Sequence, residues 1–409
     1  MTWNRLRTGG AWLTLFVALG VAQSVIQERA AAQGRGAVQA PRFEVDPFWP
    51  KPLPNHWLLG NAIGVWVDER DQVWIVHRGS ATLANNEKAL ELKAGDCCAG
   101  APGVLAFDKQ GNLIRNWGGP GPGYDWPTSN HGIFIDHTGM VWIGGNGPGD
   151  SQIMKFTQDG KFVAQYGKPN ARQTGKNAEG QPTFTPGSSD PANFGRVAKI
   201  FVEPKANEAF VADGYFNRRV AVLDASTGQM KRFWGAYGKP PDDKVALGTY
   251  DPAAPPFPHF RNPVHCADVS HDGFVYVCDR VNDRIQVFKP DGAFVREVFI
   301  AKNTKASGSV WDVAFSKDPQ QRFLYVADGI NDRIYILQRD TMEVLTSFGD
   351  GGRQPGQFYG VHSIAVDSQG NLYTTETWEG KRIQKFVNKG LAPVTSLHQG
   401  TVWPRVPQN

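Results

Sequence analysis

Three features of the sequence predict an all-β fold, a six-bladed β-propeller. One unit recurs six times in the 409 residues, and each copy holds short runs of β-branched and aromatic residues separated by tight turns. The repeat length, roughly 40 to 50 residues and longer where loops intervene, is that of one blade of four antiparallel strands. Glycine and proline make up about 18% of the chain, against roughly 12% in average proteins, as many short elements require.

Each copy of the repeat begins with an apolar strand that ends in an acidic or polar residue. These first strands cover residues 63–68, 131–136, 198–203, 265–270, 311–316 and 362–367. Second strands follow at 73–76, 141–144, 209–212, 274–277, 323–326 and 371–374. Third strands that begin with Arg lie at 219–223, 284–288, 333–337 and 382–386. Three intervals contain long loops, which are either functional lids or disordered, at about 80–102, 168–196 and 236–261.

The sixth copy has no convincing closing strand after Phe386. Because a propeller must close its ring, we assign residues 42–46 as the missing outer strand of blade six. Residues 33–409 then form a single six-bladed propeller domain, which residues 1–32 precede as a signal peptide.

The first 32 residues follow the pattern of an export signal. Arg5 and Arg7 precede an apolar run at 11–22 that is too short to span a bilayer, and the alanines at 30–32 offer a cleavage site. We favour this interpretation over an uncleaved membrane anchor. The protein is therefore expected to be secreted or periplasmic, in an oxidising compartment where disulfides persist.

The charge distribution bears on possible partners. The formal net charge is +4, and no block of Lys or Arg stands out along the chain. A nucleic-acid partner therefore has no electrostatic support. We expect a monomer with no nucleic-acid partner and no membrane contact after signal cleavage.

Four cysteines are available for disulfide bonds. Cys266 and Cys278 flank a turn signal at 270–274, and in an ideal hairpin centred on that turn they face each other. A cross-strand bridge and two buried free thiols are both consistent with this register. For the adjacent Cys97 and Cys98, in the first long loop, we favour separate thiols or bridges over a vicinal disulfide.

The innermost strand of each propeller blade lines a central channel, so equivalent residues of the six copies form a ring. At the first position this ring reads Ile63, His131, Ala198, His265, Trp311 and His362. The three histidines occupy alternate blades, about 120° apart, and are expected to converge on the axis. Such a triad suits Zn²⁺ with a fourth position open to water or substrate. A lone His is more often a core residue, but three at one repeat position favour a metal.

A second ring lies just past the second strands, at the mouth of the channel. It contains Arg78 and Arg280, which we expect to bind an anionic group of a substrate because a guanidinium matches a carboxylate. Tyr215, in the same ring, is a candidate general base. The alternative is that the two arginines form salt bridges between blades. The acidic members of the ring are interpreted as turn-stabilising residues: Asp213, Asp279 and Asp328.

Several of these segments resemble a known family. The repeats are similar to NHL repeats, and most of the chain after the signal peptide resembles peptidyl-α-hydroxyglycine α-amidating lyase. The segments that carry this resemblance are His77-Arg-Gly, Asn130-His-Gly-Ile, Asp213-Gly-Tyr-Phe-Asn-Arg, Pro263-Val-His, Asp279-Arg-Val-Asn-Asp-Arg and Val361-His-Ser-Ile. The resemblance implies an NHL-type propeller that holds a channel Zn²⁺ on His131, His265 and His362.

The resemblance further implies a zinc-dependent carbon–nitrogen lyase. Such an enzyme cleaves the N–C bond of a carbinolamide, an α-hydroxyglycine unit, to give an amide and glyoxylate. Tyr215 would act as the base and Arg78 as the anchor for the charge of a small-molecule or peptide-derived substrate. The family also has a structural Ca²⁺, but Ser363 stands where it has an Asp ligand, and Asp312 is our candidate substitute.

Two other functions are consistent with this fold. One is a non-catalytic NHL-repeat protein, in which His and Arg merely line a plugged channel and the long loops contact a protein or glycan. The other is a lactonase-like hydrolase, which would use a calcium site of acidic and amide ligands. Because the inner ring here carries histidines, we rank the lyase first and the hydrolase third.

Overall fold

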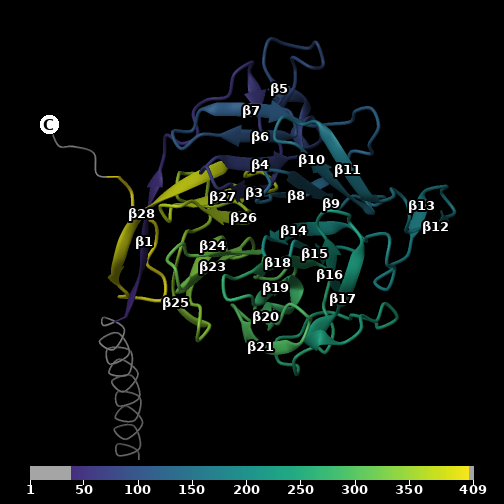
Figure 1. The fold of residues 1–409 in the computed structure, drawn as a ribbon. Coiled ribbons are helices and arrows are strands. Elements are labelled where there is room, and N and C mark those ends of the chain that lie inside the picture. Colours follow the sequence, from purple (N-terminus) through teal and green to yellow (C-terminus); the bar gives the residue numbers. More distant parts are fainter. Residues whose placement is uncertain (1–37, 405–409) are drawn as a thin grey trace, which may run out of the picture.

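The computed structural model describes residues 38–404 as six four-stranded antiparallel sheets arranged in a ring (Figure 1). Five sheets are formed by consecutive segments of the chain, and the sixth combines its two ends. This is the six-bladed β-propeller that the repeat predicts. The proposed signal peptide lies outside the described residues.

Blades one to three come first in the chain. Blade one contains β3 (Ala62–Val67), β4 (Val73–His77), β6 (Val104–Phe107) and β7 (Leu113–Trp117). Blade two contains β8 (Asn130–Ile135), β9 (Val141–Gly145), β10 (Gln152–Phe156) and β11 (Phe162–Gly167). Blade three contains β14 (Val197–Glu203), β15 (Glu208–Asp213), β16 (Arg219–Asp224) and β17 (Met230–Trp234).

Blades four to six complete the ring. Blade four contains β18 (Val264–Val269), β19 (Val275–Asp279), β20 (Arg284–Phe288) and β21 (Phe294–Phe299). Blade five contains β22 (Asp312–Phe315), β23 (Phe323–Asp328), β24 (Arg333–Gln338) and β25 (Glu343–Phe348). Blade six contains β26 (Val361–Val366), β27 (Leu372–Glu376), β28 (Ile383–Pro393) and β1 (Gln39–Asp46).

Short elements occur in and around the long loops. Two small sheets pair β2 (Trp57–Leu58) with β5 (Ala99–Gly100) and β12 (Gln173–Lys176) with β13 (Pro182–Phe184). Single 3₁₀ turns are η1 (Gly79–Thr82), η2 (Asn85–Glu87), η3 (Ala236–Gly238) and η4 (Arg280–Asn282). Within residues 38–404, no helix has the length and apolar character needed to cross a membrane.

The ring is closed by β1, as predicted. This strand pairs antiparallel with β28, with Val45 opposite Phe386 and Phe43 opposite Asn388. In Figure 1 the purple β1 accordingly lies beside the yellow β28. Both strands exceed their predicted bounds, because β1 begins at Gln39 and β28 continues to Pro393.

The acidic residue at the end of a first strand organises the turn that follows. Asp68 Oδ1 accepts two backbone N–H groups of that turn, and Oδ2 accepts the indole N–H of Trp74 at 2.9 Å. Asp136 binds the indole of Trp142 in the same way, at 2.8 Å. Both indole rings are fully buried. The Asp and the aromatic residue of the second strand are therefore one structural unit, in which a short polar side chain fixes a turn.

All four cysteines form disulfides, Cys266 with Cys278 and Cys97 with Cys98. The Cys266–Cys278 bridge joins β18 to β19. Ala267 pairs with Val277, as the predicted register requires, and the register shifts between Ala267 and Val264. Our preference for separate thiols at Cys97 and Cys98 is wrong. The chain folds back at this point, with the Cys98 carbonyl accepting the N–H of Leu90 at 3.2 Å, and the two neighbours pair with each other.

Ring closure generates a prediction about Phe43, which is 3% exposed and packs against the rings of Tyr325 and Phe348 in blade five. Phe43→Ala removes this contact between blades and is expected to lower the free energy of unfolding by about 3–5 kcal/mol. Phe48→Ala is the control, because Phe48 is 78% exposed, and should change it by less than about 0.5 kcal/mol. Denaturant unfolding measures both, and equal effects of the two substitutions would contradict a packed closing strand.

Candidate metal centre

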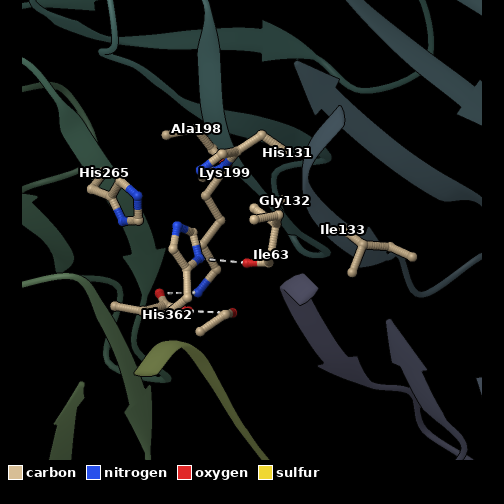
Figure 2. A pocket seen from close by; sticks show the side chains of 10 residues that line it. Ile63, His131, Gly132, Ile133, Ala198, Lys199, His265 and His362 are labelled. Atoms are coloured by element: carbon tan, nitrogen blue, oxygen red, sulfur yellow. Dashed lines mark hydrogen bonds and ion pairs between the residues drawn. The ribbon is translucent and has the colours of Figure 1, made fainter. Parts of the chain in front are cut away.

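Three imidazoles meet in the channel, as the ring of repeat positions predicts (Figure 2). His131 comes from β8, His265 from β18 and His362 from β26, and each is at most 3% exposed. One nitrogen of each imidazole lies within 4.8 Å of the corresponding nitrogens of the other two. The three rings border a small cavity of about 10 Å³, about the size that holds one water.

Each histidine is oriented by a hydrogen bond to the next blade. Nδ1 of His131 lies 2.6 Å from the carbonyl oxygen of Ala198, and Nδ1 of His362 lies 2.6 Å from that of Ile63. His265 makes the equivalent contact with the carbonyl of Trp311. A carbonyl only accepts, so Nδ1 carries the proton and the lone pair of each imidazole is on Nε2. Carbonyls that orient histidines in this manner are typical of metal sites.

A close backbone approach is part of this arrangement. Gly132, which follows His131, has φ +67°, and a Cβ at this position would collide with the carbonyl oxygen of Ala198. This is the same oxygen that accepts the His131 hydrogen bond. Only glycine tolerates both the left-handed conformation and the contact.

The three histidines are neutral in this environment. Burial lowers the pKa of each imidazole, that of His362 to about 3. The positive charge of Arg280 acts in the same direction on all three. A neutral imidazole is the form that ligates a metal ion.

Tyr215 contacts two of the three histidines at the channel mouth. Its hydroxyl oxygen lies 3.1 Å from Nε2 of His131 and 3.0 Å from Nε2 of His265. It also accepts a hydrogen bond of 3.2 Å from Arg280 Nη1. Tyr215 lies just beyond β15, in the turn that leads to the third strand of blade three. The structure therefore brings the predicted base and the predicted metal ligands together.

Arg280 is the first residue of η4 and approaches the site from blade four. Its guanidinium lies 4.5 Å from the centre of the Trp311 ring and 5.5 Å from that of Tyr215. Such contacts hold a guanidinium without neutralising its charge. Its Nε is buried and has no hydrogen-bond partner among residues 38–404.

Arg78 approaches from the opposite side of the channel, after the end of β4. Its Nη2 donates a 2.8 Å hydrogen bond to Oδ1 of Asn146, which also accepts from Ser129 at 2.8 Å. Burial lowers the pKa of Arg78, and Tyr215 acts to raise it. In the described part of the chain, Arg78 Nε has no partner, and neither Arg78 nor Arg280 forms a salt bridge. The salt-bridge alternative for these two residues therefore has no support.

The aspartates at the channel mouth have structural roles, as expected. Asp213 and Asp279 form buried ion pairs of 2.8 Å with the first arginines of the next strands, Arg219 and Arg284. Asp328 accepts the backbone N–H of Asn331 at 2.9 Å in its own turn. These carboxylates are engaged within their blades and do not extend the metal site.

Sequence reasoning missed the side chains that hold the two arginines. Asn146 belongs to the ring at the channel mouth and Trp311 to the histidine ring, but residue type alone indicated no partner for either. Their roles depend on contacts between different blades. Arg78 contacts Asn146, 68 residues away in sequence, and Arg280 contacts Trp311, 31 residues away. Only the fold brings these pairs together.

The donor set fits Zn²⁺. Three neutral imidazoles, each oriented through Nδ1, present Nε2 toward a shared point, and a catalytic zinc typically has three protein ligands and one open position. The fold and this site together define a class, six-bladed β-propellers with a candidate three-histidine centre in the channel.

Comparison with known proteins gives distant homologues. No protein-family model matches the chain. Peptidyl-α-hydroxyglycine α-amidating lyase 1 of Drosophila melanogaster is 24% identical over 374 residues, 85% of this chain and 60% of that protein. NHL repeat-containing protein 3 of Mus musculus is 26% identical over 263 residues, 62% of this chain and 58% of that protein. The chain thus has homologues with these two names, and spans less than two thirds of each.

One of the solved structures that match this chain is also a lyase by its name. A streptogramin B lyase structure aligns with 85% of this chain and 98% of its own, at 14% identity and a TM-score of 0.49.

A prediction follows for Asp283, the residue that ends the η4 turn of Arg280. Its φ is +53°, its Oδ1 accepts the Ser309 N–H at 2.8 Å, and burial raises its pKa to about 8. Between pH about 4 and about 8 the folded protein therefore holds a proton that the unfolded chain has released, so stability falls as pH rises through this range. Asp283→Asn keeps the accepting oxygen and removes the titration.

The free energy of unfolding of Asp283→Asn, relative to that of the wild type, should increase from pH 5 to pH 8. Denaturant unfolding at several pH values measures it. The exposed Asp291→Asn is the control and should show no such trend. A constant difference for Asp283→Asn would show that this carboxyl does not titrate abnormally.

Proposed function

We propose that this protein is a zinc-dependent carbon–nitrogen lyase that cleaves a carbinolamide, such as an N-acyl-α-hydroxyglycine, to an amide and an aldehyde such as glyoxylate. The observation that carries the proposal is the position of the Tyr215 hydroxyl, within 3.1 Å of two imidazole nitrogens and 3.2 Å of Arg280. Similarity to an amidating lyase over 85% of the chain supports the same reaction class.

The metal would be held by Nε2 of His131, His265 and His362. When bound, Zn²⁺ supplies Lewis-acid polarisation of an oxygen ligand. The protein contributes the neutral, oriented imidazoles and a buried surrounding from which most water is excluded. The buried surrounding increases the strength of electrostatic interactions in the site.

The two arginines would bind the carboxylate of the substrate. Arg78 and Arg280 approach Tyr215 from different blades, and each has a buried Nε–H without a partner in the described chain. A carboxylate offers four lone pairs and matches guanidinium donors. Two uncompensated positive charges beside the histidines thus favour an anionic substrate over a neutral one.

Tyr215 would take the proton of the substrate hydroxyl. The C–O bond then becomes the carbonyl of the aldehyde, and the C–N bond breaks with its electron pair remaining on nitrogen. That nitrogen gains a proton and leaves as the amide, so the proton released from the hydroxyl balances the one taken up. No water is consumed and no redox partner is needed.

A secreted or periplasmic location fits this proposal. The described residues hold two disulfides, which form and persist in oxidising compartments and are rare in the cytosol. One of them includes Cys266, the residue after His265, and therefore joins the strand that carries this histidine, β18, to β19.

The metal assignment predicts the effect of His265→Ala. Purified wild-type protein, never exposed to chelators, should contain about one Zn²⁺ per chain, and the variant should lose most of it because two imidazoles bind zinc weakly. Elemental analysis measures the content. His271→Ala, in the exposed turn of the same blade, is the control and should keep the metal. Zinc-free wild-type protein would rule out the lyase and favour a non-catalytic NHL-repeat protein.

The assignment of the base predicts the effect of Tyr215→Phe. This variant should retain its zinc but lose turnover of an N-acyl-α-hydroxyglycine by about 10²–10⁴-fold, the usual contribution of a general base. Glyoxylate release measures the rate. Tyr166→Phe, on the outer strand β11, is the control and should leave turnover intact. Undiminished turnover in Tyr215→Phe would remove this residue from the mechanism.

A further inference from the structure

Next to the ring of histidines, a lysine on β14 is buried between two carboxylates. It is Lys199, the residue after Ala198. Lys199 Nζ lies 2.8 Å from Asp268 Oδ2 and 2.6 Å from Asp312 Oδ1. The exposed fractions of these side chains are 6%, 3% and 3%. Although burial acts to lower the pKa of Lys199, the two carboxylates raise it above its usual value, so the ammonium is charged.

This ion pair belongs to a network that crosses the channel. Ser363 Oγ donates to the second oxygen of Asp312 at 2.7 Å, and the Val65 N–H donates to Ser363 Oγ at 3.3 Å. Lys199 comes from blade three, Asp268 from blade four, Asp312 from blade five, Ser363 from blade six and Val65 from blade one. Five of the six blades are thus joined through buried polar contacts at the axis.

The network is adjacent in sequence to the groups that orient the histidines. Lys199 follows Ala198, and Asp312 follows Trp311, the two residues whose carbonyls accept from His131 and His265. Ser363 follows His362 itself. The backbone that directs the imidazoles of His131 and His265 is therefore held directly beside this network. Figure 2 shows Lys199 next to the three histidines in the same pocket.

A Ca²⁺ ion does not fit among these side chains. Calcium requires six to eight oxygen ligands, and the carboxylate oxygens that face each other across the channel already bind the Lys199 ammonium. Asp312, which we considered a substitute calcium ligand, pairs with this ammonium instead. Cys266, the other potential ligand beside the two aspartates, is consumed by its disulfide.

We propose that Lys199 is a built-in cation that takes the position of a structural calcium and, through Asp268, Asp312 and Ser363, positions the three histidines. The part of this inference that concerns metal affinity rests on the proposed zinc function, and the part that concerns calcium does not. Removing the lysine side chain leaves two buried carboxylates and a space, which is a ligand set for a hard divalent cation.

The test compares the thermal unfolding midpoints of wild type, Lys199→Ala and Lys199→Met in CaCl₂, with equal MgCl₂ as the control salt. The wild-type midpoint should not respond to calcium. Lys199→Ala should unfold several degrees lower and recover in CaCl₂ but not in MgCl₂, because Mg²⁺ is smaller and dehydrates reluctantly. Lys199→Met fills the space with an apolar chain, so its midpoint should be low in both salts.

A second measurement reports on positioning. Titration with Co²⁺, followed by its visible absorption, should show about 10- to 100-fold weaker binding to calcium-free Lys199→Ala than to wild type, as loss of an orienting contact does elsewhere. Addition of CaCl₂ should restore the affinity. A lysine with a merely structural role would not give recovery by calcium. Lys205→Ala, an exposed lysine at the end of the same hairpin, is the control and should behave as wild type.

Three results would overturn the inference. Stoichiometric calcium in wild-type protein dialysed against CaCl₂ would do so without any variant, even if Lys199→Ala failed to fold. If Lys199→Met unfolded at the same temperature as the wild type, the ammonium would be dispensable. A low midpoint for Lys199→Ala that CaCl₂ leaves unchanged would show that the carboxylates form no cation site. Failure of wild type to bind Co²⁺ or Zn²⁺ would instead contradict the zinc proposal, and the calcium response would still be measurable.

Discussion

The candidate centre depends on one contact that occurs three times, a hydrogen bond from histidine Nδ1 to a carbonyl of the next blade. Its acceptors, Ile63, Ala198 and Trp311, occupy the same repeat position as the histidines, but in blades one, three and five. Blades that donate therefore alternate with blades that accept. The bond fixes the tautomer and the direction of each ring, and it also ties neighbouring blades at the axis.

Charge is ordered along the channel. Two arginines without salt bridges in the described chain lie at the mouth, three neutral imidazoles follow, and one ammonium with two carboxylates lies behind them. The last group has a formal excess of one negative charge, which favours a cation at the histidines. The arginines favour an anion in front of it. This sequence of charges suits a metal ion that meets an anionic ligand, and in a buried channel such interactions are weakly screened.

Much of this arrangement was predictable from the sequence, because the repeat assigns equivalent positions to equivalent places in the ring. That reasoning found the six blades, the closing strand and the convergence of the histidines. It failed where side chains reach across the channel. Nothing in the repeat shows that Lys199 would extend to Asp312, or that Arg280 would lie over Trp311. For Cys97 and Cys98, which lie outside the regular strands, no register was available to predict their pairing.

The closing strand has a consequence for the biosynthesis of the protein. β1 is the first strand that the structure describes, but its partner β28 is the last, so it is made after the other five blades. His131 and His362 are likewise separated by most of the ring. Until the final blade is complete, the carbonyl of Ile63 has no imidazole to orient and the three ligands cannot meet. Binding of the proposed metal would therefore be a late event, and a bound ion would report that an individual chain has closed its ring.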